Sequence, residues 1–185
     1  MKLFLGISIP HSVQSYLADL QPEQSNSIRL VLPKLMHITL HYIGEAEPKQ
    51  IIESVEHSLK SFEITTFKLH LTELGYFGAK SKPAVLWASP NLSESLKLLH
   101  SQLTGVLNEL NMAIDDRHYQ PHITLARGRW RKKPDQAERD LLQRFYVQTI
   151  EPIEFEVLDF VLFESKASEC GREYRVVERF SLIKE

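Results

Sequence analysis

The sequence has few cysteines, which can cross-link a fold, and few of the glycines and prolines that are typical of irregular or disordered segments. Its 185 residues include one cysteine, Cys170, which excludes an internal disulfide, leaves no paired cysteines for zinc and suits a reducing compartment. It has only seven glycines and nine prolines, with no low-complexity stretch. This composition predicts an ordered globular chain that forms a single domain over residues 1–185.

Long apolar runs and a large net charge are also missing. The apolar stretch before Pro10 is too short for a signal-peptide core, and no later run approaches about 18 apolar residues. We therefore expect a cytoplasmic protein with no membrane partner. Lys and Arg (22) nearly balance Asp and Glu (24), so any surface for nucleic acid must be a local patch.

A tetrapeptide headed by histidine occurs twice. HITL occupies residues 37–40 inside KLMHITLHYIG and residues 122–125 inside QPHITLARGR. Apolar residues surround both copies in short runs that are typical of strands. In a strand, His37 and Thr39 share one face while Ile38 and Leu40 share the other, so each copy offers one polar and one core-facing side.

Periodicity predicts the elements around these motifs. Ser, Asp or Asn caps and apolar residues at helical spacing predict helices, and alternating or branched runs predict strands. The capping box of the longest helix is assigned to Asn91 and Glu94, and residues 75–83 are expected to form a long hairpin loop. The predicted helices span residues 12–20, 47–62, 91–110 and 135–146. The predicted strands span residues 2–9, 28–43 (one or two strands), 67–74, 84–88, 153–164 and 173–183.

The two halves of the chain have the same order of elements. Each has a helix, a strand with HITL, a second helix and a pair of strands. Duplication of one α/β unit about a pseudo-two-fold axis explains this order and predicts that the two HITL strands lie near each other, flanking a cleft.

Two facing histidines suit phosphodiester cleavage. One imidazole can remove a proton from the attacking oxygen while the other protonates the leaving oxygen, because a pKa near 6.5 allows one neutral and one charged ring. The threonine hydroxyls can donate hydrogen bonds to phosphate oxygens. A single His-x-Thr on a strand is usually structural, but packing does not require the same polar pair twice, so we favour catalysis.

These motifs resemble the two-histidine (2H) phosphoesterases, which carry a pair of His-x-Thr/Ser-x motifs. Within that group the chain is similar to the bacterial and archaeal RNA 2′,3′-cyclic phosphodiesterases, once called 2′-5′ RNA ligases. KLFLGISIP resembles the first strand, MHITLHYIGE and QPHITLARGR the two motifs, and FVLFESKASECGREYRVVERF the closing strand pair. The resemblance implies an α+β fold in which two pseudo-symmetric lobes of antiparallel sheet, with outer helices, flank a central cleft.

The resemblance also implies roles for the motif residues. His37 would be the proton donor to the ribose 3′-oxygen, and His122 the proton acceptor from water. Thr39 and Thr124 would bind the phosphate. The expected partners are RNA ends or nucleotides with a 2′,3′-cyclic phosphate, handled by a monomer without metal or cofactor.

Two further features adjoin the motifs. Relatives usually carry a small or apolar residue where this chain has His41, which we place at the rim of the cleft in preference to its wall. A basic run, RGRWRKK, follows the second motif, and such a run next to an aromatic suits phosphates and a stacked base. Arg127 is the candidate for phosphate contact, and the possible RNA-binding residues are Arg129, Trp130, Arg131, Lys132 and Lys133.

Three other functions stay open at this point. Asp115, Asp116 and His118, with a motif histidine, could form a metal site, although the chain has no HExxH or HxH pattern. The chain could be a non-catalytic RNA-binding module in which the basic run supplies affinity. It could also be a phosphodiesterase for a small cyclic nucleotide or ADP-ribose cyclic phosphate.

Overall fold

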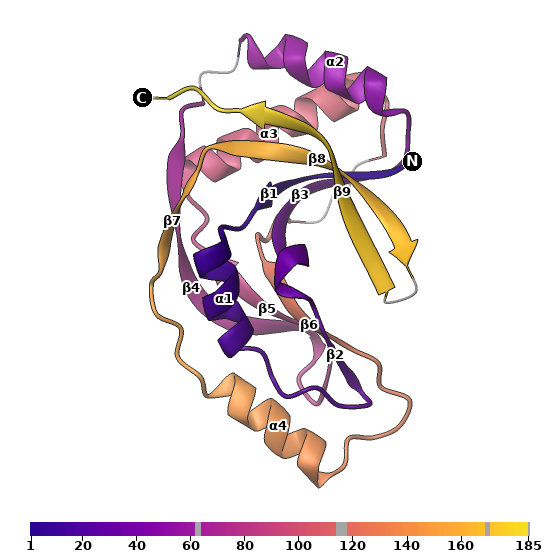
Figure 1. Cartoon of the computed structure of the whole chain (residues 1–185), viewed down its shortest axis with the longest axis vertical. Helices are drawn as coiled ribbons and strands as arrows, with labels where there is room; N and C mark the ends of the chain where they lie inside the picture. Colours follow the sequence, from indigo (N-terminus) through magenta and orange to yellow (C-terminus); the bar gives the residue numbers. More distant parts are fainter. Residues whose placement is uncertain (62–63, 114–117, 169–170, 185) are drawn as a thin grey trace.

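The fold combines four α-helices with a large antiparallel sheet (Figure 1). A computed structural model of the chain describes residues 1–61, 64–113, 118–168 and 171–184. Its helices are α1 (His11–Asp19), α2 (Pro48–Leu59), α3 (Glu94–Glu109) and α4 (Gln136–Tyr146), with a 3-10 turn, η1, at Pro33–Leu35. Its strands are β1 (Lys2–Ser8), β2 (Ile28–Leu30), β3 (His37–Glu45), β4 (Phe67–Ala79), β5 (Lys82–Pro90), β6 (Ile123–Gly128), β7 (Glu154–Val157), β8 (Asp159–Ser168) and β9 (Gly171–Ser181).

The strands divide into two lobes that meet at the motif strands. The order is β7-β4-β5-β6-β3-β1-β8-β9, every pair of named neighbours is antiparallel, and β2 pairs with β6. We call β3, β1, β8 and β9 lobe A, and β6, β5, β4, β7 and β2 lobe B. The ladder between β3 and β6 consists of one residue pair, Ile38 with Ile123, whereas the ladders inside each lobe are longer. The predicted α+β fold class with antiparallel sheet is therefore confirmed.

Helices cover each lobe on the outside. In Figure 1, α2 and α3 lie together over lobe A, while α1 and α4 lie beside lobe B. Lobe A thus receives α2, which follows β3, and α3, which precedes β6. Lobe B receives α1, which precedes β3, and α4, which follows β6. The strand pair that closes each half of the chain likewise joins the lobe of the other motif strand, because β4 and β5 lie beside β6 whereas β8 lies beside β1. This exchange is what a duplicated unit with swapped elements would produce, and the duplication itself stays a prediction.

Side-chain caps and apolar stripes set the helix positions. Ser93 Oγ accepts from Leu96 N–H and caps α3, whose leucine stripe at 96, 99, 103 and 107 is fully buried. The predicted cap at Asn91 is wrong, because its side-chain oxygen accepts instead from His70 N–H on β4. At α4 the predicted start is confirmed, with Asp135 and Glu138 forming a reciprocal capping box.

The predicted long loop at residues 75–83 is instead the end of a tight hairpin. Strand β4 continues to Ala79 and β5 begins at Lys82. The glycine that reads as a loop signal, Gly75, is packed under Trp87, where an added Cβ would lie 2.2 Å from the indole ring. Gly75 is thus a close-packing residue inside a strand, which sequence alone does not distinguish from a turn glycine.

The predicted strand over residues 153–164 is two strands in different lobes. β7 pairs with β4 at the edge of lobe B, and β8 pairs with β1 in lobe A, with Leu158 between them. β7 is buried on one face and β8 is apolar on both faces over residues 160–163, but both segments are typical of strands, so periodicity could not reveal the change of lobe. Among the described residues, no helix is long and apolar enough to cross a membrane.

Candidate active site

The register of the two motif strands brings four polar side chains together. Because β3 and β6 are antiparallel with Ile38 opposite Ile123, His37 lies across from Thr124 and Thr39 across from His122. Ile38 and Ile123 are fully buried in the core, so these four residues occupy the opposite face. We call His37, Thr39, His122 and Thr124 the motif quartet. The predicted proximity of the two HITL strands is confirmed.

His37 is held by hydrogen bonds at both ring nitrogens. Nδ1 lies 2.7 Å from the Leu35 carbonyl oxygen, which can only accept, so Nδ1 carries the proton in the neutral ring. Nε2 is then the lone-pair nitrogen and lies 3.1 Å from Thr39 Oγ1, which donates to it. Phe4 and Tyr174 contact the ring, with centroids 4.9 Å and 5.0 Å away. Leu35 ends the η1 turn, so backbone structure fixes this acceptor.

The first motif also depends on a glycine in the neighbouring strand. An added Cβ at Gly6 of β1 would lie 2.8 Å from the Ile38 carbonyl oxygen and 3.7 Å from the His37 ring. Any other residue at this position would press β1 away from β3, which carries His37. Gly6 therefore belongs to the support of the site.

His122 repeats the tautomer but not the surroundings. Its Nδ1 lies 3.0 Å from the Gln120 carbonyl oxygen, two residues back as in the first motif, so Nε2 again carries the lone pair. Among the described residues one ring contacts it, Phe77 of β4, which is edge-on with centroids 4.9 Å apart. Phe77 was not predicted among the site residues, yet it is only partly buried and lies beside the site.

Both histidines are neutral at neutral pH in the free protein. Burial lowers the pKa of His37 from 6.5 to about 4, outweighing its carbonyl hydrogen bond, and the charge of Arg127, with that of His122 whenever it is protonated, lowers the pKa further. Burial lowers the pKa of His122 as well, with Arg127 adding to the effect. This differs from the expected mixture of one charged and one neutral ring, because desolvation acts on both copies.

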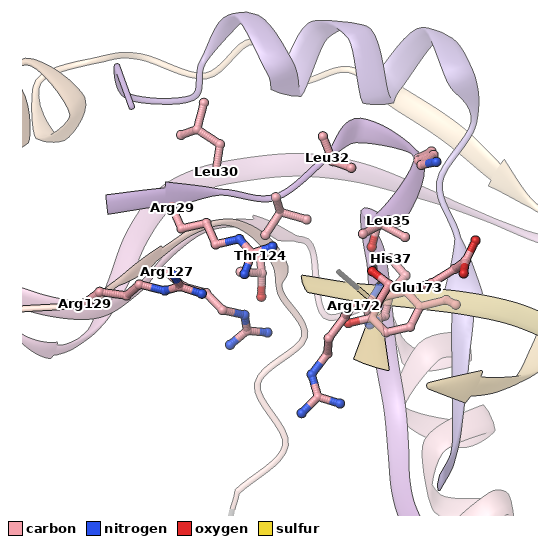
Figure 2. Close-up of a pocket in the computed structure, with 14 residues that line it drawn as sticks. Arg29, Leu30, Leu32, Leu35, His37, Thr124, Arg127, Arg129, Arg172 and Glu173 are labelled. Atoms are coloured by element: carbon pink, nitrogen blue, oxygen red, sulfur yellow. Dashed lines mark hydrogen bonds between the residues drawn. The ribbon is translucent and has the colours of Figure 1, made fainter. Parts of the chain in front are cut away.

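A positively charged cavity opens on the His37 side of the quartet. Its volume is about 590 Å³, and His37 and Thr124 form part of its wall. Figure 2 shows Arg29, Arg127 and Arg129 on one side, with Arg172 and Glu173 on the other beside His37. We call this space the basic cavity. Its charged lining residues are Arg29, Lys34, Arg127, Arg129, Arg172 and Glu173.

A second cavity opens on the His122 side. It has a volume of about 490 Å³ and contains the other two quartet residues, Thr39 and His122. We call it the histidine cavity, because three further histidines line it together with aromatic and polar residues. These lining residues include His41, His100, His118, Phe77, Tyr119 and Gln120. The quartet therefore lies between two cavities, with one of its two histidines in the wall of each.

His41 and Trp130 do not lie where the sequence placed them. His41 is only 6% exposed and lies in the wall of the histidine cavity, so the expected rim position is wrong; the cause is packing against α3. Trp130 lines neither cavity, because its indole N–H donates to the Pro83 carbonyl oxygen at 2.9 Å. Its ring is half-buried and covers Gly128 instead of facing the cleft.

The basic run contributes two of its five cations to the site. Arg127 and Arg129 line the basic cavity, as predicted for the end nearest the motif. The exposed Arg131, Lys132 and Lys133 line neither cavity. Sequence reasoning missed Arg29, Lys34 and Arg172, since each is an isolated cation whose position depends on the strand order.

The described residues offer no cluster for a metal. Within residues 1–61, 64–113, 118–168 and 171–184, no group of three or more His, Cys, Asp or Glu side chains could hold an ion. His118 lies in the wall of the histidine cavity. Asp115 and Asp116, the carboxylates of the metal hypothesis, and Cys170 lie outside the described residues.

Two facing His-x-Thr strands at the centre of a two-lobed antiparallel sheet define a two-histidine phosphoesterase. The chain belongs to the 2′-5′ RNA ligase superfamily, whose family model matches residues 10–169. It is therefore an enzyme of the two-histidine phosphoesterase type.

Known relatives match nearly the whole chain. The RNA 2′,3′-cyclic phosphodiesterase of Thermus thermophilus is 29% identical over 191 residues, which cover 98% of this chain and 90% of the relative. The protein of the same name from Thermotoga maritima is 25% identical over 183 residues, covering 96% and 93%. A crystal structure of a Thermus thermophilus protein matches with a TM-score of 0.80 at 25% identity, covering 100% of both chains.

Proposed function

We propose that this protein hydrolyses the 2′,3′-cyclic phosphate at the end of an RNA chain to a 2′-phosphate. The observation that carries the proposal is the strand register, which sets His37 and His122 across the quartet with Nε2 of each ring free of backbone partners. The names of the Thermus and Thermotoga relatives support the same reaction.

The chemical step needs one base and one acid. His122 Nε2 accepts a proton from a water whose oxygen attacks phosphorus, and the bond from phosphorus to O3′ breaks in line with that attack. His37, protonated at Nε2, donates its proton to O3′. The 2′-oxygen keeps the phosphate, and a proton passing from His122 back to His37 restores the starting state.

Substrate binding must raise the pKa of His37. With a pKa of about 4, roughly one free molecule in a thousand has this ring charged at pH 7. The negative charge of the bound cyclic phosphate stabilises the imidazolium and so favours the reactive protonation state. The same burial that lowers the pKa makes the protonated ring a stronger acid toward the leaving oxygen.

Thr39, Thr124 and Arg127 hold the phosphate in this scheme. The two hydroxyls lie across from the histidines, where they can donate to the non-bridging oxygens. Arg127 lies close enough to both imidazoles to lower the pKa of each, so its guanidinium is near the position that the phosphate would take. A fixed cation there stabilises the charge that develops on phosphorus oxygens.

The basic cavity is the proposed path of the RNA. Five cations against one carboxylate suit successive phosphates of a single strand, and the cavity adjoins His37, the proposed donor to the ribose oxygen. A small cyclic nucleotide would use the quartet without needing the outer cations. The lining therefore favours RNA over the small-substrate alternative.

Phosphorus NMR tests the reaction. A short RNA that ends in a 2′,3′-cyclic phosphate is incubated with the protein in EDTA. The cyclic signal should be replaced by that of a 2′-phosphomonoester. A 3′-phosphate product would reverse the proposed regiochemistry, and a lasting cyclic signal would refute the metal-free reaction on RNA.

A further inference from the structure

Three aromatic rings form a continuous stack beside the quartet. The centroids of His41 and His100 are 4.2 Å apart with an interplanar angle of 23°, and those of His100 and Tyr119 are 3.8 Å apart at 16°. The rings come from three parts of the chain: strand β3, helix α3 and the segment that leads into His122. We call His41, His100 and Tyr119 the ring stack.

The base of the stack is fixed to α3. His41 Nε2 lies 3.0 Å from the His100 carbonyl oxygen, so this nitrogen carries the proton and donates. Thr104 Oγ1 lies 3.1 Å from the same nitrogen and donates to the same carbonyl at 2.8 Å. His41 thus has the opposite tautomer to the two motif histidines, and its N–H is committed to the helix.

The top of the stack is fixed to the first motif. The Tyr119 hydroxyl donates to the Thr39 carbonyl oxygen at 3.3 Å. Burial raises the pKa of Tyr119, which keeps the hydroxyl protonated and able to donate. One tyrosine therefore ties the segment before His122 to the strand that carries His37.

The segment between Tyr119 and His122 has no backbone ladder of its own. Residues 118–122 lie outside every helix and strand, yet the Gln120 carbonyl oxygen must stay 3.0 Å from His122 Nδ1. The Gln120 side chain is exposed, but both neighbours are anchored: Tyr119 by the stack, and Pro121 by Ser89 Oγ, which donates to its carbonyl at 3.2 Å. Side chains, not backbone pairing, therefore place this carbonyl.

We propose that the ring stack is a positioning device for His122: it holds the Gln120 carbonyl on Nδ1 so that Nε2 keeps the lone pair needed to accept a proton from water. The inference rests on the proposed role of His122 as base. His41, His100 and Tyr119 are positioning residues in this scheme and do not touch the reacting atoms. Loss of the stack would free the carbonyl and let the proton move to Nε2, where the ring cannot act as base.

Histidine tautomers and kinetics together test the device. Nitrogen-15 NMR of the histidines in the wild-type protein should show His122 protonated at Nδ1. In His100→Ala, which removes the middle ring, we expect mixed tautomers at His122, an unchanged His37, and a fall in kcat of about 10-fold with little change in KM. His100→Phe restores a planar ring and should recover most of both signals. His57→Ala, at an exposed position on α2, is the matched control.

A second position keeps the test decisive. If His100→Ala does not fold, Tyr119→Leu takes its place, with Tyr119→Phe removing the hydrogen bond to Thr39 alone. An unchanged His122 tautomer after loss of the stack, or a loss of kcat that His100→Phe does not recover, overturns the inference. The NMR signal does not depend on turnover, so a wild-type protein inactive on cyclic phosphate would refute the proposed function separately.

Discussion

The two HITL motifs share four residues and the same tautomer, but the protein supports them in different ways. The acceptor for His37 Nδ1 ends a 3-10 turn, and several aromatic rings surround the imidazole. The acceptor for His122 lies in an irregular segment placed by side chains, with Phe77 alone among the described rings in contact with the imidazole. Identical sequence thus leads to unequal surroundings.

This difference agrees with the roles that we propose, in which His37 is the acid and His122 is the base. A ring enclosed by aromatics has a strongly lowered pKa and is a strong acid once protonated, as a donor to a poor leaving oxygen must be. A ring next to a polar cavity has access to water, as a base must have. A motif that occurs twice can therefore supply both halves of one proton cycle, because the surroundings of the two copies differ although their sequence does not.

Removal of either imidazole is expected to have the largest effect. His37→Ala and His122→Ala should each lower kcat by about 10²- to 10⁴-fold, because each removes one of two proton transfers. Steady-state assays on a cyclic-phosphate RNA, with circular dichroism to confirm folding, measure this. His57→Ala should retain full activity. Near-normal turnover in either variant would show that His37 and His122 do not act together in one catalytic cycle.

Arg127 is the residue that both motifs share electrostatically. Arg127→Gln should lower kcat by about 10²-fold through loss of phosphate stabilisation. Because Arg127 lowers the pKa of both histidines, its removal should also shift the pH optimum upward. A pH profile of the variant, beside Lys49→Gln on the exposed face of α2, checks both effects. A lower rate with an unmoved optimum would place Arg127 away from the imidazoles.

The outer cations should distinguish RNA from small substrates. Arg129→Gln together with Arg172→Gln should weaken RNA binding by about 10-fold and flatten its salt dependence, while hydrolysis of a cyclic mononucleotide changes little. Substitution of Arg131, Lys132 and Lys133, which line neither cavity, should matter less. If this second set weakens RNA binding more, the RNA follows the loop and not the basic cavity.

The protein should become less stable as the pH is lowered, because folding disfavours protonation of its buried histidines. The folded pKa of His37, about 4, is below its unfolded value of 6.5, so the unfolded state binds more protons as pH falls through this window. Between pH 7 and 5 this residue contributes a loss of roughly 1 to 2 kcal/mol in the free energy of unfolding. Urea titrations at both pH values measure the loss, which should shrink in His37→Gln and persist in His57→Gln.

Much of the framework could be predicted because it depends on local pattern. The duplicated HITL on strand-forming residues, the leucine stripe of α3 and the start of α4 near residue 135 could all be predicted from spacing. The polar face of the motif strands follows from alternation alone. These features need no knowledge of which elements meet in space.

The rest of the site depends on contacts between distant segments. Arg29 and Arg172 line the basic cavity and Phe77 lines the histidine cavity because the strand order brings β2, β9 and β4 to the site, and no local signal encodes this order. The Trp130 N–H donates to the Pro83 carbonyl oxygen, 47 residues earlier in the chain, and no local pattern predicts this contact. The sequence predicts a rim position for His41 because the residue that it contacts, His100, lies 59 residues later in the chain, on α3.

The assignment of acid and base is tested most directly by a substrate whose leaving group needs no acid. A uridine 2′,3′-cyclic phosphate with sulfur in place of O3′ expels a thiolate, which leaves without protonation. His37→Ala should hydrolyse this substrate at nearly the wild-type rate, whereas His122→Ala should stay slow. Recovery of His122→Ala in place of His37→Ala, or of neither variant, would contradict the account.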